Sequence, residues 1–254
     1  MIKVVILGSG NVGTHLFKTF KNNSQINITQ WYSRNIKDIN QYSKSVKTTD
    51  KIKDLDDADL YILAVNDDSI HELSALLPFK NRLVCHTSGS KSINELNENN
   101  RAAVFYPLQT FSKDNELDFT KIPLCLETEN SEDMITLKSI VKYLGCKYYE
   151  IDSNQREKLH LAAVFVNNFT NHMFTIAKTI TDDSSIDFNI LKPLISETVN
   201  KIYKLDPRDA QTGPAVRGDD KTINKHIQDL KSKEHRELYR LVTSLINNLD
   251  NEKL

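Results

Sequence analysis

The chain has 254 residues, of which 39% are hydrophobic and 26% are charged, a composition typical of a globular protein with one sizeable and one smaller domain. Lysine and arginine number 33 against 34 aspartate and glutamate residues, so the formal net charge is -1. Such a balance provides no global basic field for nucleic acid or an anionic membrane. We therefore expect the partner to be a small-molecule substrate, with no nucleic acid and no membrane.

The cysteines and the N-terminus indicate the compartment. Cys85, Cys125 and Cys146 are far apart, odd in number and form no C-x-x-C, which predicts a reducing environment without disulfides and no metal site. The chain enters an apolar stretch directly, without a charged leader, and no apolar run approaches about 18 residues. We expect a cytoplasmic protein.

The stretch 2–13 predicts a strand that turns into a helix through the motif G-x-G-x-x-G. The first glycine permits the tight turn, the second lets the backbone approach a pyrophosphate, and the third lets the helix pack closely on its strand. The diphosphate would meet free N–H groups at the positive end of the helix dipole. A purely structural turn is the alternative. The predicted cofactor-binding residues here are Gly8, Ser9, Gly10, Asn11, Val12 and Gly13.

The second predicted strand, 26–32, ends in Ser33 and Arg34. A site that prefers NAD usually has an acid at this position for the ribose hydroxyls, whereas a hydroxyl and a guanidinium suit a 2′-phosphate. This pattern favours NADP(H). The alternative is that Arg34 is a solvated surface charge and Ser33 caps the next helix.

Two further predicted strands end at the carboxyl edge of the sheet, where ligands bind in open α/β folds. The strand 59–65 leads into Asn66, and we expect Ala64, Val65 and Asn66 to form a wall of the cofactor site. The strand 82–85 leads into His86 and three hydroxyl residues. Either His86 meets the substrate or nicotinamide, with Thr87, Ser88 and Gly89 beside it, or it bonds locally as a structural residue.

The hydrophobic pattern of the rest of the chain predicts an α/β part followed by an all-helical part. We expect short helices at 35–44, 69–77 and 93–96, strands at 45–48, 102–106, 122–127 and 146–151, and a helix at 133–144. Beyond this the pattern is helical, at 154–180, 189–203, 221–231 and 234–249. The predicted fold class is α/β plus all-α: a doubly wound Rossmann domain at 1–151, followed by an all-helical domain at 152–254.

The first of these late helices carries a polar stripe. At about 100° per residue, His160, Val164, Asn167 and Asn171 fall within roughly 60° of each other, with Asn168 at the border. Most of the remaining circumference is apolar, which predicts a buried helix. We interpret the stripe as the lining of a cleft, and hydrogen bonding between helices is the alternative.

Four segments give the chain a specific resemblance: H-T-S-G-S at 86–90, Y-P-L-Q-T-F at 106–111, H-L-A-A-V-F-V-N-N at 160–168 and T-G-P-A-V-R-G-D at 212–219. With the Rossmann motif, they resemble a bacterial family of uncharacterised NADP-binding oxidoreductases. That family lies within the superfamily of 6-phosphogluconate dehydrogenase and pyrroline-5-carboxylate reductase. The resemblance covers nearly the whole chain and implies a helical domain that dimerises and completes the active-site cleft.

One departure from the superfamily bears on catalysis. The 3-hydroxyacid dehydrogenases carry A-A-K-x-x-N-N on the central helix, with the lysine as general acid and base, whereas this chain has Val164 in the lysine position. Valine cannot move a proton, so His160, one turn earlier, is the predicted replacement, with His86 second. Asn167 and Asn168 match the family asparagines and would hold an oxyanion or a substrate carboxylate.

The sequence thus predicts an NADP(H)-dependent oxidoreductase that transfers hydride to or from a small carbonyl or imine acid at the cleft between the domains. Arg217, in the loop before the third late helix, would clamp a carboxylate or contact a partner subunit, or else is a plain loop residue. The main alternative, motivated by Val164, is a non-catalytic NADP(H)-binding sensor. A prephenate-type dehydrogenase, suggested by Tyr106 and Pro107, is the weaker third hypothesis because few cationic substrate contacts are found.

Overall fold

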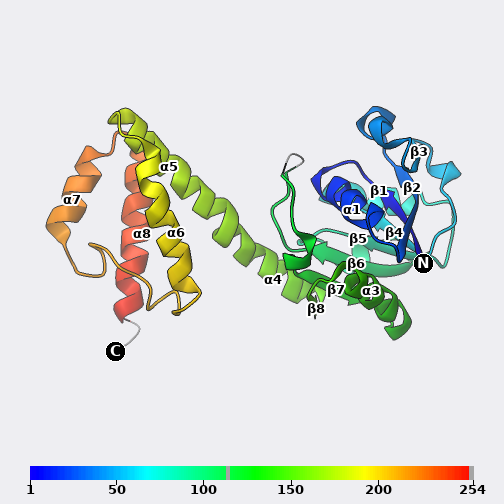
Figure 1. Cartoon of the computed structure of the whole chain (residues 1–254). Coiled ribbons are helices and arrows are strands. Elements are labelled where there is room, and N and C mark those ends of the chain that lie inside the picture. Colours follow the sequence, from blue (N-terminus) through cyan, green and yellow to red (C-terminus); the bar gives the residue numbers. More distant parts are fainter. Residues whose placement is uncertain (113–114, 252–254) are drawn as a thin grey trace. The chain divides into compact units, whose positions relative to one another are not determined.

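The computed structural model describes residues 1–112 and 115–251, and its contacts group into two units, unit 1 at 1–167 and unit 2 at 168–254 (Figure 1). Unit 1 contains an eight-stranded sheet in the order β3-β2-β1-β4-β5-β6-β7-β8, parallel except between β6 and β7. This is the Rossmann order with two added strands. The strands are β1 Ile2–Leu7, β2 Ile26–Tyr32, β3 Lys47–Thr49, β4 Leu60–Leu63, β5 Leu83–His86, β6 Arg101–Pro107, β7 Leu124–Thr128 and β8 Tyr148–Glu150.

Among its described residues, unit 1 has four α-helices: α1 Asn11–Lys21, α2 Ile70–Ala75, α3 Ser131–Leu144 and α4 Ser153–Ala163. The helices expected at 35–44 and 93–96 are only 3-10 turns, at Ile36–Asp38, Asn40–Tyr42 and Ile93–Glu95. The side chains of Asn35 and Ser92 accept hydrogen bonds from the backbone two residues later, and such local bonds compete with α-helix formation. The predicted domain boundary, between 151 and 152, comes just before α4, whose contacts are grouped with the sheet.

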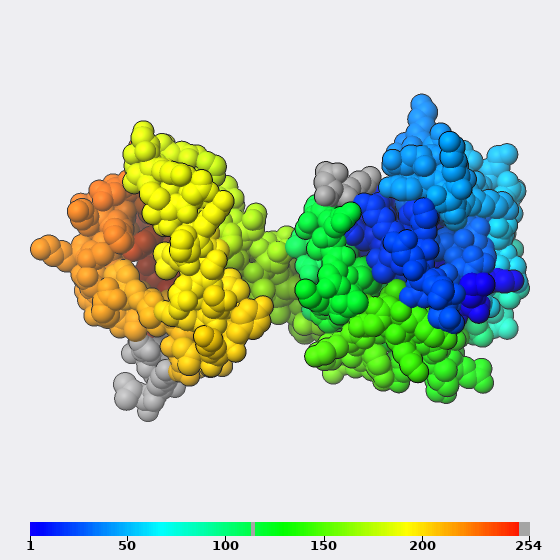
Figure 2. All heavy atoms as spheres, in the orientation of Figure 1, coloured from blue at the N-terminus to red at the C-terminus, as the bar shows by residue number. Residues whose placement is uncertain are grey.

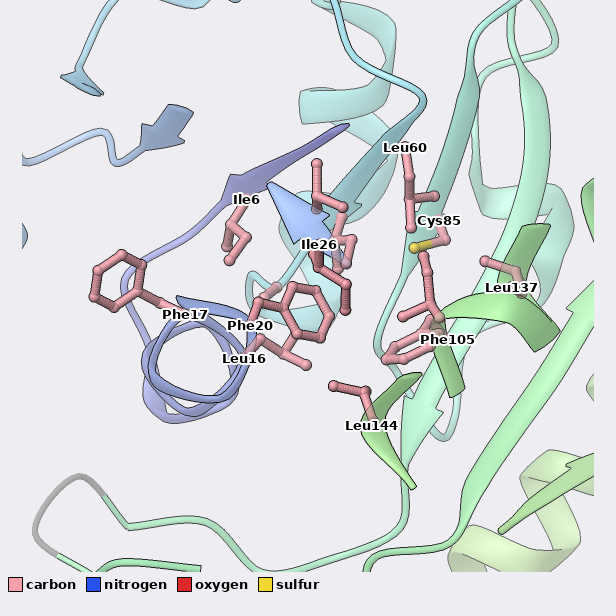
Figure 3. Close-up of a cluster of buried hydrophobic side chains, with 14 of the residues drawn as sticks. Ile6, Leu16, Phe17, Phe20, Ile26, Leu60, Cys85, Phe105, Leu137 and Leu144 are labelled. Atoms are coloured by element: carbon pink, nitrogen blue, oxygen red, sulfur yellow. The ribbon is translucent and has the colours of Figure 1, made fainter. Parts of the chain in front are cut away.

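The core of unit 1 lies on both faces of the sheet. Along β1, Val4 and Ile6 join the cluster under α1 and α3, whereas Val5 and Leu7 join the cluster on the opposite face. Figure 3 shows part of the first cluster, where side chains of the two helices meet those of the strands. Because Val4 to Leu7 of β1 are buried on both faces, this part of the strand is a continuous apolar run in the sequence.

A buried ion pair fixes the start of α4 to the sheet. Arg156 has no exposed side-chain surface, and its guanidinium donates to the carboxylate of Glu127 in β7 and to the backbone oxygen of Lys91. Ser153 adds a hydroxyl that donates to the same carboxylate at 2.9 Å. Three segments distant in sequence are therefore joined at one point, which sets the direction in which α4 leaves the sheet.

The helix that continues from α4 is not regular. A π-helical segment, Val164–Phe169, separates it from α5, Thr170–Asp183. The predicted helix at 154–180 is therefore correct in extent. The wider π turn changes the angle between successive side chains, on which the predicted polar stripe depends. Unit 2 continues with α6 Lys192–Ile202, α7 Asp220–Asp229 and α8 Lys233–Asn251.

The expectation that this long helix is buried is wrong for the chain taken by itself. Phe165 is 61% exposed, Val166 74% and Phe169 48%. Among the described side chains of unit 2, only Thr181 and Ile223 are buried. Figure 2 shows atoms of α8 at the floor of a hollow between α6 and α7. The predicted burial is absent because unit 2 by itself supplies too little surface to cover these apolar side chains. In the part of the chain that the structure describes, no helix combines the length and apolarity needed to cross a membrane.

The buried pair generates a stability prediction. Glu127→Gln keeps the shape of the side chain but leaves the Arg156 charge unpaired, and we expect the free energy of unfolding to fall by about 3 kcal/mol. Urea denaturation of the whole chain measures this. Glu150→Gln is the matched control, because Glu150 pairs with Lys138 at 2.7 Å on the surface and such pairs contribute less than about 1 kcal/mol. Equal effects of the two substitutions would contradict this account.

Candidate cofactor and active site

A cavity of about 420 Å³ opens at the carboxyl edge of the sheet, around the turn from β1 to α1. It spans the ends of β1, β2 and β4, the place where ligands bind in doubly wound folds. Most of the predicted cofactor-binding residues line it, with further residues from the segments after β2 and from α2. The lining is Gly8, Ser9, Gly10, Tyr32, Ser33, Arg34, Asn35, Asp38, Ala64, Val65, Asn66, Ser69, Glu72, Leu73 and Leu76.

The three glycines of the motif have different physical roles. Gly8 has φ +118°, and a Cβ there would lie 2.1 Å from the backbone oxygen of Ala64. A Cβ on Gly13 would lie 2.3 Å from the oxygen of Gly8, so α1 approaches β1 closely only because residue 13 is glycine. Apart from Gly10 itself and its two chain neighbours, no described residue has an atom within 4 Å of a Cβ built on Gly10, whose φ is an ordinary -69°. The fold therefore requires Gly8 and Gly13 but not Gly10.

The helix end beside Gly10 is open. In the described chain, no side chain caps the N-terminus of α1, and its first turn has no acidic residue. Free N–H groups there attract an anion, and the absence of a Cβ on Gly10 lets that anion come close. Asn11 and Val12 face elsewhere: the Asn11 amide donates to the oxygen of Phe111 at 2.8 Å, and Val12 packs against the core.

At the other end of the cavity, a hydroxyl and a carboxylate are linked. Ser33 is buried and donates to the Ser9 hydroxyl at 2.9 Å, which in turn donates to Asp38 at 3.1 Å. Asn35 donates to the second oxygen of Asp38 at 2.9 Å. Arg34 is exposed, lines the same cavity, and has no ion-pair partner among the described residues. A free guanidinium next to an open cavity is suited to bind a phosphate.

Asp38 was missed by the sequence reasoning, which looked for an acid only at the end of β2. It comes from the 3-10 turn Ile36–Asp38, and the turn folds back towards Ser9. A carboxylate can accept hydrogen bonds from ribose hydroxyls, so its presence opposes the preference for a 2′-phosphate that Arg34 favours. Its oxygens already accept bonds from Ser9 and Asn35, which uses part of that capacity.

The structure places His86 at the end of β5, fully buried. Its Nδ1 accepts a hydrogen bond from the Ser88 N–H, and its Nε2 lies 3.2 Å from the backbone oxygen of Ser92. Burial, helped by the charge of Arg156, lowers the pKa of His86 to about 4. The one hydrogen of this neutral imidazole is engaged by the Ser92 oxygen and its other nitrogen by the Ser88 N–H, so this geometry favours the structural alternative for His86.

His160 on α4 has a partner that the sequence did not indicate. Its Nδ1 lies 3.1 Å from the hydroxyl oxygen of Tyr106 at the end of β6. Gly89 lies against both, because a Cβ built there would be 2.7 Å from His160 Nδ1 and 2.8 Å from the Tyr106 oxygen. The structure therefore brings together the predicted residues His160 and Gly89, with Tyr106 as a third member.

Other predicted site residues are placed without such contacts. Thr87 and Ser88 are buried in the turn after β5, where the Ser88 hydroxyl accepts from the backbone of Ser90. Asn167 is exposed at the end of unit 1. Asn168 and Arg217 belong to unit 2 and are also exposed. Within the described ranges, no cluster of three or more histidine, cysteine or acidic residues is arranged to hold a metal ion.

The sheet order, the glycine turn and this cavity define a Rossmann-type nucleotide-binding protein with a helical C-terminal part. Residues 122–246 match a family described as Domain of unknown function (DUF2520). The chain is 36% identical to a solved structure from Bacteroides fragilis, named "putative NADP oxidoreductase", over 97% of this chain and 98% of that chain, with a TM-score of 0.88. The chain belongs to the same family as that protein.

More distant solved structures share the fold. A protein from Thermotoga maritima is 20% identical, with a TM-score of 0.75 over 98% of this chain and 99% of that chain. An imine reductase from Myxococcus stipitatus, solved with NADP+, is 14% identical, with a TM-score of 0.67 over 98% and 93%. Comparison with curated protein sequences gives no match.

The contrast between two glycines gives a direct test of the cavity. We expect Gly10→Ala to leave the melting temperature unchanged but to weaken NADPH binding at least about tenfold, because its Cβ enters the space for the diphosphate. Gly13→Ala should lower the free energy of unfolding by about 1–3 kcal/mol, because its Cβ meets the Gly8 carbonyl. Thermal denaturation and a fluorescence titration with NADPH measure both variants. Normal NADPH binding by Gly10→Ala would count against this site.

Proposed function

We propose that this protein is an NADP(H)-dependent oxidoreductase that reduces a small carbonyl or imine acid. The observation that carries the proposal is the open backbone at Gly10 beside the uncapped end of α1, in the same cavity as Arg34. Nothing in the packing of the described residues requires glycine at this position, so a ligand that needs close approach accounts for it. The family relationship to the Bacteroides fragilis protein supports the same class of activity.

The residues present fit a nicotinamide dinucleotide phosphate. The N–H groups around Ser9, Gly10 and Asn11 would bind the diphosphate, and Ser33 and Arg34 would bind the 2′-phosphate. Ala64, Val65 and Asn66 would form the wall beside the ribose. In this fold the dinucleotide crosses from the β2 side to the β4 side of the sheet, and β5 and β6 follow next in order.

Bound NADPH would supply the hydride. The task of the chain is then to hold the substrate and deliver a proton to the oxygen or nitrogen of its reacting double bond. His160 is the proposed donor, because it lies beside the loop after β5 and an imidazole can exchange protons near neutral pH. Asn167, Asn168 and Arg217 remain proposed substrate ligands, with amide and guanidinium groups suited to a carboxylate.

The cofactor preference is tested by an opposed pair of substitutions. Arg34→Ala removes the proposed phosphate ligand, and we expect NADPH affinity to fall about 10- to 100-fold with NADH affinity unchanged. Asp38→Asn removes a negative charge from the same end of the cavity and should strengthen NADPH binding. Calorimetric titration with both cofactors measures these changes. An unchanged ratio of NADPH to NADH affinity in Arg34→Ala would overturn the assignment of NADP(H).

Activity is measured as NADPH consumption against keto acids, aldehydes and cyclic imines, with His160→Gln run alongside the natural sequence. Turnover that falls about 10²- to 10⁴-fold in His160→Gln would support the proposed acid. No turnover in protein shown to bind NADPH would instead favour the sensor function that Val164 suggests.

We further propose that the protein is a homodimer whose second copy covers unit 2. Besides the exposed residues of the π-helical segment, Ile190 is 68% exposed, Leu194 62% and Leu245 57%. A helical unit with so few buried apolar side chains among those described cannot offset its conformational entropy alone. A matching apolar face of another copy would bury these residues.

The dimer predicts a stability that depends on protein concentration. We expect the midpoint of thermal unfolding to rise as the protein is concentrated, because association stabilises the folded state by mass action. Leu194→Glu should produce a monomer in light scattering, whereas Ile135→Glu should not. Ile135 is 65% exposed but lies on α3 of unit 1, so it is a matched control. A monomeric natural sequence at all concentrations would contradict the proposal.

A further inference from the structure

Tyr106 has a buried hydroxyl next to the proposed proton donor His160. It is 9% exposed, at the carboxyl end of β6, and burial raises the pKa of its hydroxyl to about 12. Its Oη lies 3.1 Å from His160 Nδ1, and the two rings meet edge to face at 73° with centroids 6.1 Å apart. Since a β-strand and a helix supply the two partners, the tertiary structure holds this pair in place.

The pair touches the loop where the site was predicted. A Cβ on Gly89 would approach both His160 Nδ1 and the Tyr106 oxygen within 3 Å, so the loop can lie against the pair only with glycine at this position. The contact places the pair against the loop that follows β5.

The buried ion pair between Arg156 and Glu127, at the start of α4, supports the hydrogen-bonded pair of Tyr106 and His160. Arg156 binds the oxygen of Lys91, at the end of the same loop, and His160 follows Arg156 by four residues, about one helical turn. Arg156 therefore fixes the loop and His160 together. Its positive charge also favours the ionised form of Tyr106, in opposition to the larger effect of burial.

We infer that Tyr106 and His160 form a proton relay, in which Tyr106 acts through His160. The Tyr106 hydroxyl donates to His160 Nδ1, which leaves the hydrogen of the neutral ring on Nε2. This inference rests on the proposed reductive function.

The substrate carbon gains hydride and its double bond opens; its oxygen or nitrogen takes the Nε2 hydrogen of His160. Nδ1 takes the Tyr106 proton; after the product leaves, water protonates Nε2 and Nδ1 returns its proton to the Tyr106 oxygen, which restores the starting state of the pair. The transfer is downhill because an alkoxide or a deprotonated amine is a stronger base than tyrosinate.

The relay predicts a distinctive dependence on pH. With Tyr106 as the proton source, kcat should stay level from about pH 6 to 9, because the hydroxyl, with its pKa of about 12, remains protonated. In Tyr106→Phe only a protonated imidazole can serve, so kcat should fall as pH rises over the same range, and at pH 8 it should be about 100-fold below that of the natural sequence. NADPH affinity should stay within about twofold, because Tyr106 lies outside the cavity around Gly10.

The matched control is Tyr239→Phe. Tyr239 and His226 form another tyrosine–histidine pair, with Oη 2.9 Å from Nδ1, in unit 2. This substitution should leave the pH profile unchanged.

If Tyr106→Phe does not fold, Gly89→Ala serves instead, because its Cβ forces the pair apart while both side chains remain. Nitrogen NMR measures the hydrogen bonding of the His160 ring, whose signals are assigned by their loss in His160→Gln. Nδ1 should accept a hydrogen bond in the natural sequence but not in Tyr106→Phe or Gly89→Ala.

The outcomes separate the two proposals. Turnover in the natural sequence with a level pH profile that Tyr106→Phe converts to a falling one supports the relay. The same level profile and rate in Tyr106→Phe would overturn the relay while the oxidoreductase stands. An unaltered His160 ring spectrum in Tyr106→Phe would overturn it independently of any substrate. No NADPH turnover in the natural sequence would mean that the proposed function itself is wrong, and the relay with it.

Discussion

The carbonyl of Gly8 is the point on which the nucleotide-binding half depends. The Trp31 indole donates to it at 2.8 Å from β2, and α1 passes so close that only glycine fits at position 13. Ala64, which follows β4, also lies against Gly8, because a Cβ on Gly8 would meet the Ala64 oxygen. Since these contacts join β1, β2, β4 and α1, they also determine that the uncapped end of α1 opens into the cavity at Gly10. The fold and the site therefore share one constraint.

A second constraint determines the other half of the proposed site. Arg156 and Glu127 bring β7, the loop after β5 and the start of α4 to one place. A buried ion pair gives little net stability by itself, but it is costly to break and so specifies a particular arrangement. Here that arrangement puts His160 beside Tyr106. The sequence did not indicate this role of Arg156, because Arg156 lies next to other charged residues in a polar stretch and nothing in the pattern distinguishes it from them.

Features governed by local pattern were predictable from the sequence. The strands β1 and β4 and the glycine turn follow from short apolar runs and from one motif. The turns Ile36–Asp38 and Ile93–Glu95 differ from the predicted short helices because hydrogen bonds of the Asn35 and Ser92 side chains compete with α-helix formation. Asp38 and Tyr106 could not be placed because their roles depend on contacts across 29 and 54 residues of sequence. The π-helical segment altered the face on which Asn167 lies, and no periodicity in the sequence announces such a segment.

The apolar surface of unit 2 shows a different limit. The sequence pattern of the long helix predicts a buried apolar face, but a pattern does not say which surface would cover that face. In the chain by itself Val166 and Leu194 remain exposed. The same residues that disagree with the simple prediction are the ones that support the proposed dimer, because exposed apolar faces of this extent mark interfaces.

The central claim is that the cavity around Gly10 and Arg34 binds the 2′-phosphorylated adenosine half of NADP(H). Calorimetric titration with adenosine 2′,5′-bisphosphate and with 5′-AMP tests it without requiring any substrate. The account predicts that the bisphosphate binds at least about tenfold more tightly than 5′-AMP and that NADPH displaces it. Equal affinity for the two nucleotides, or no binding of the bisphosphate, would contradict the account.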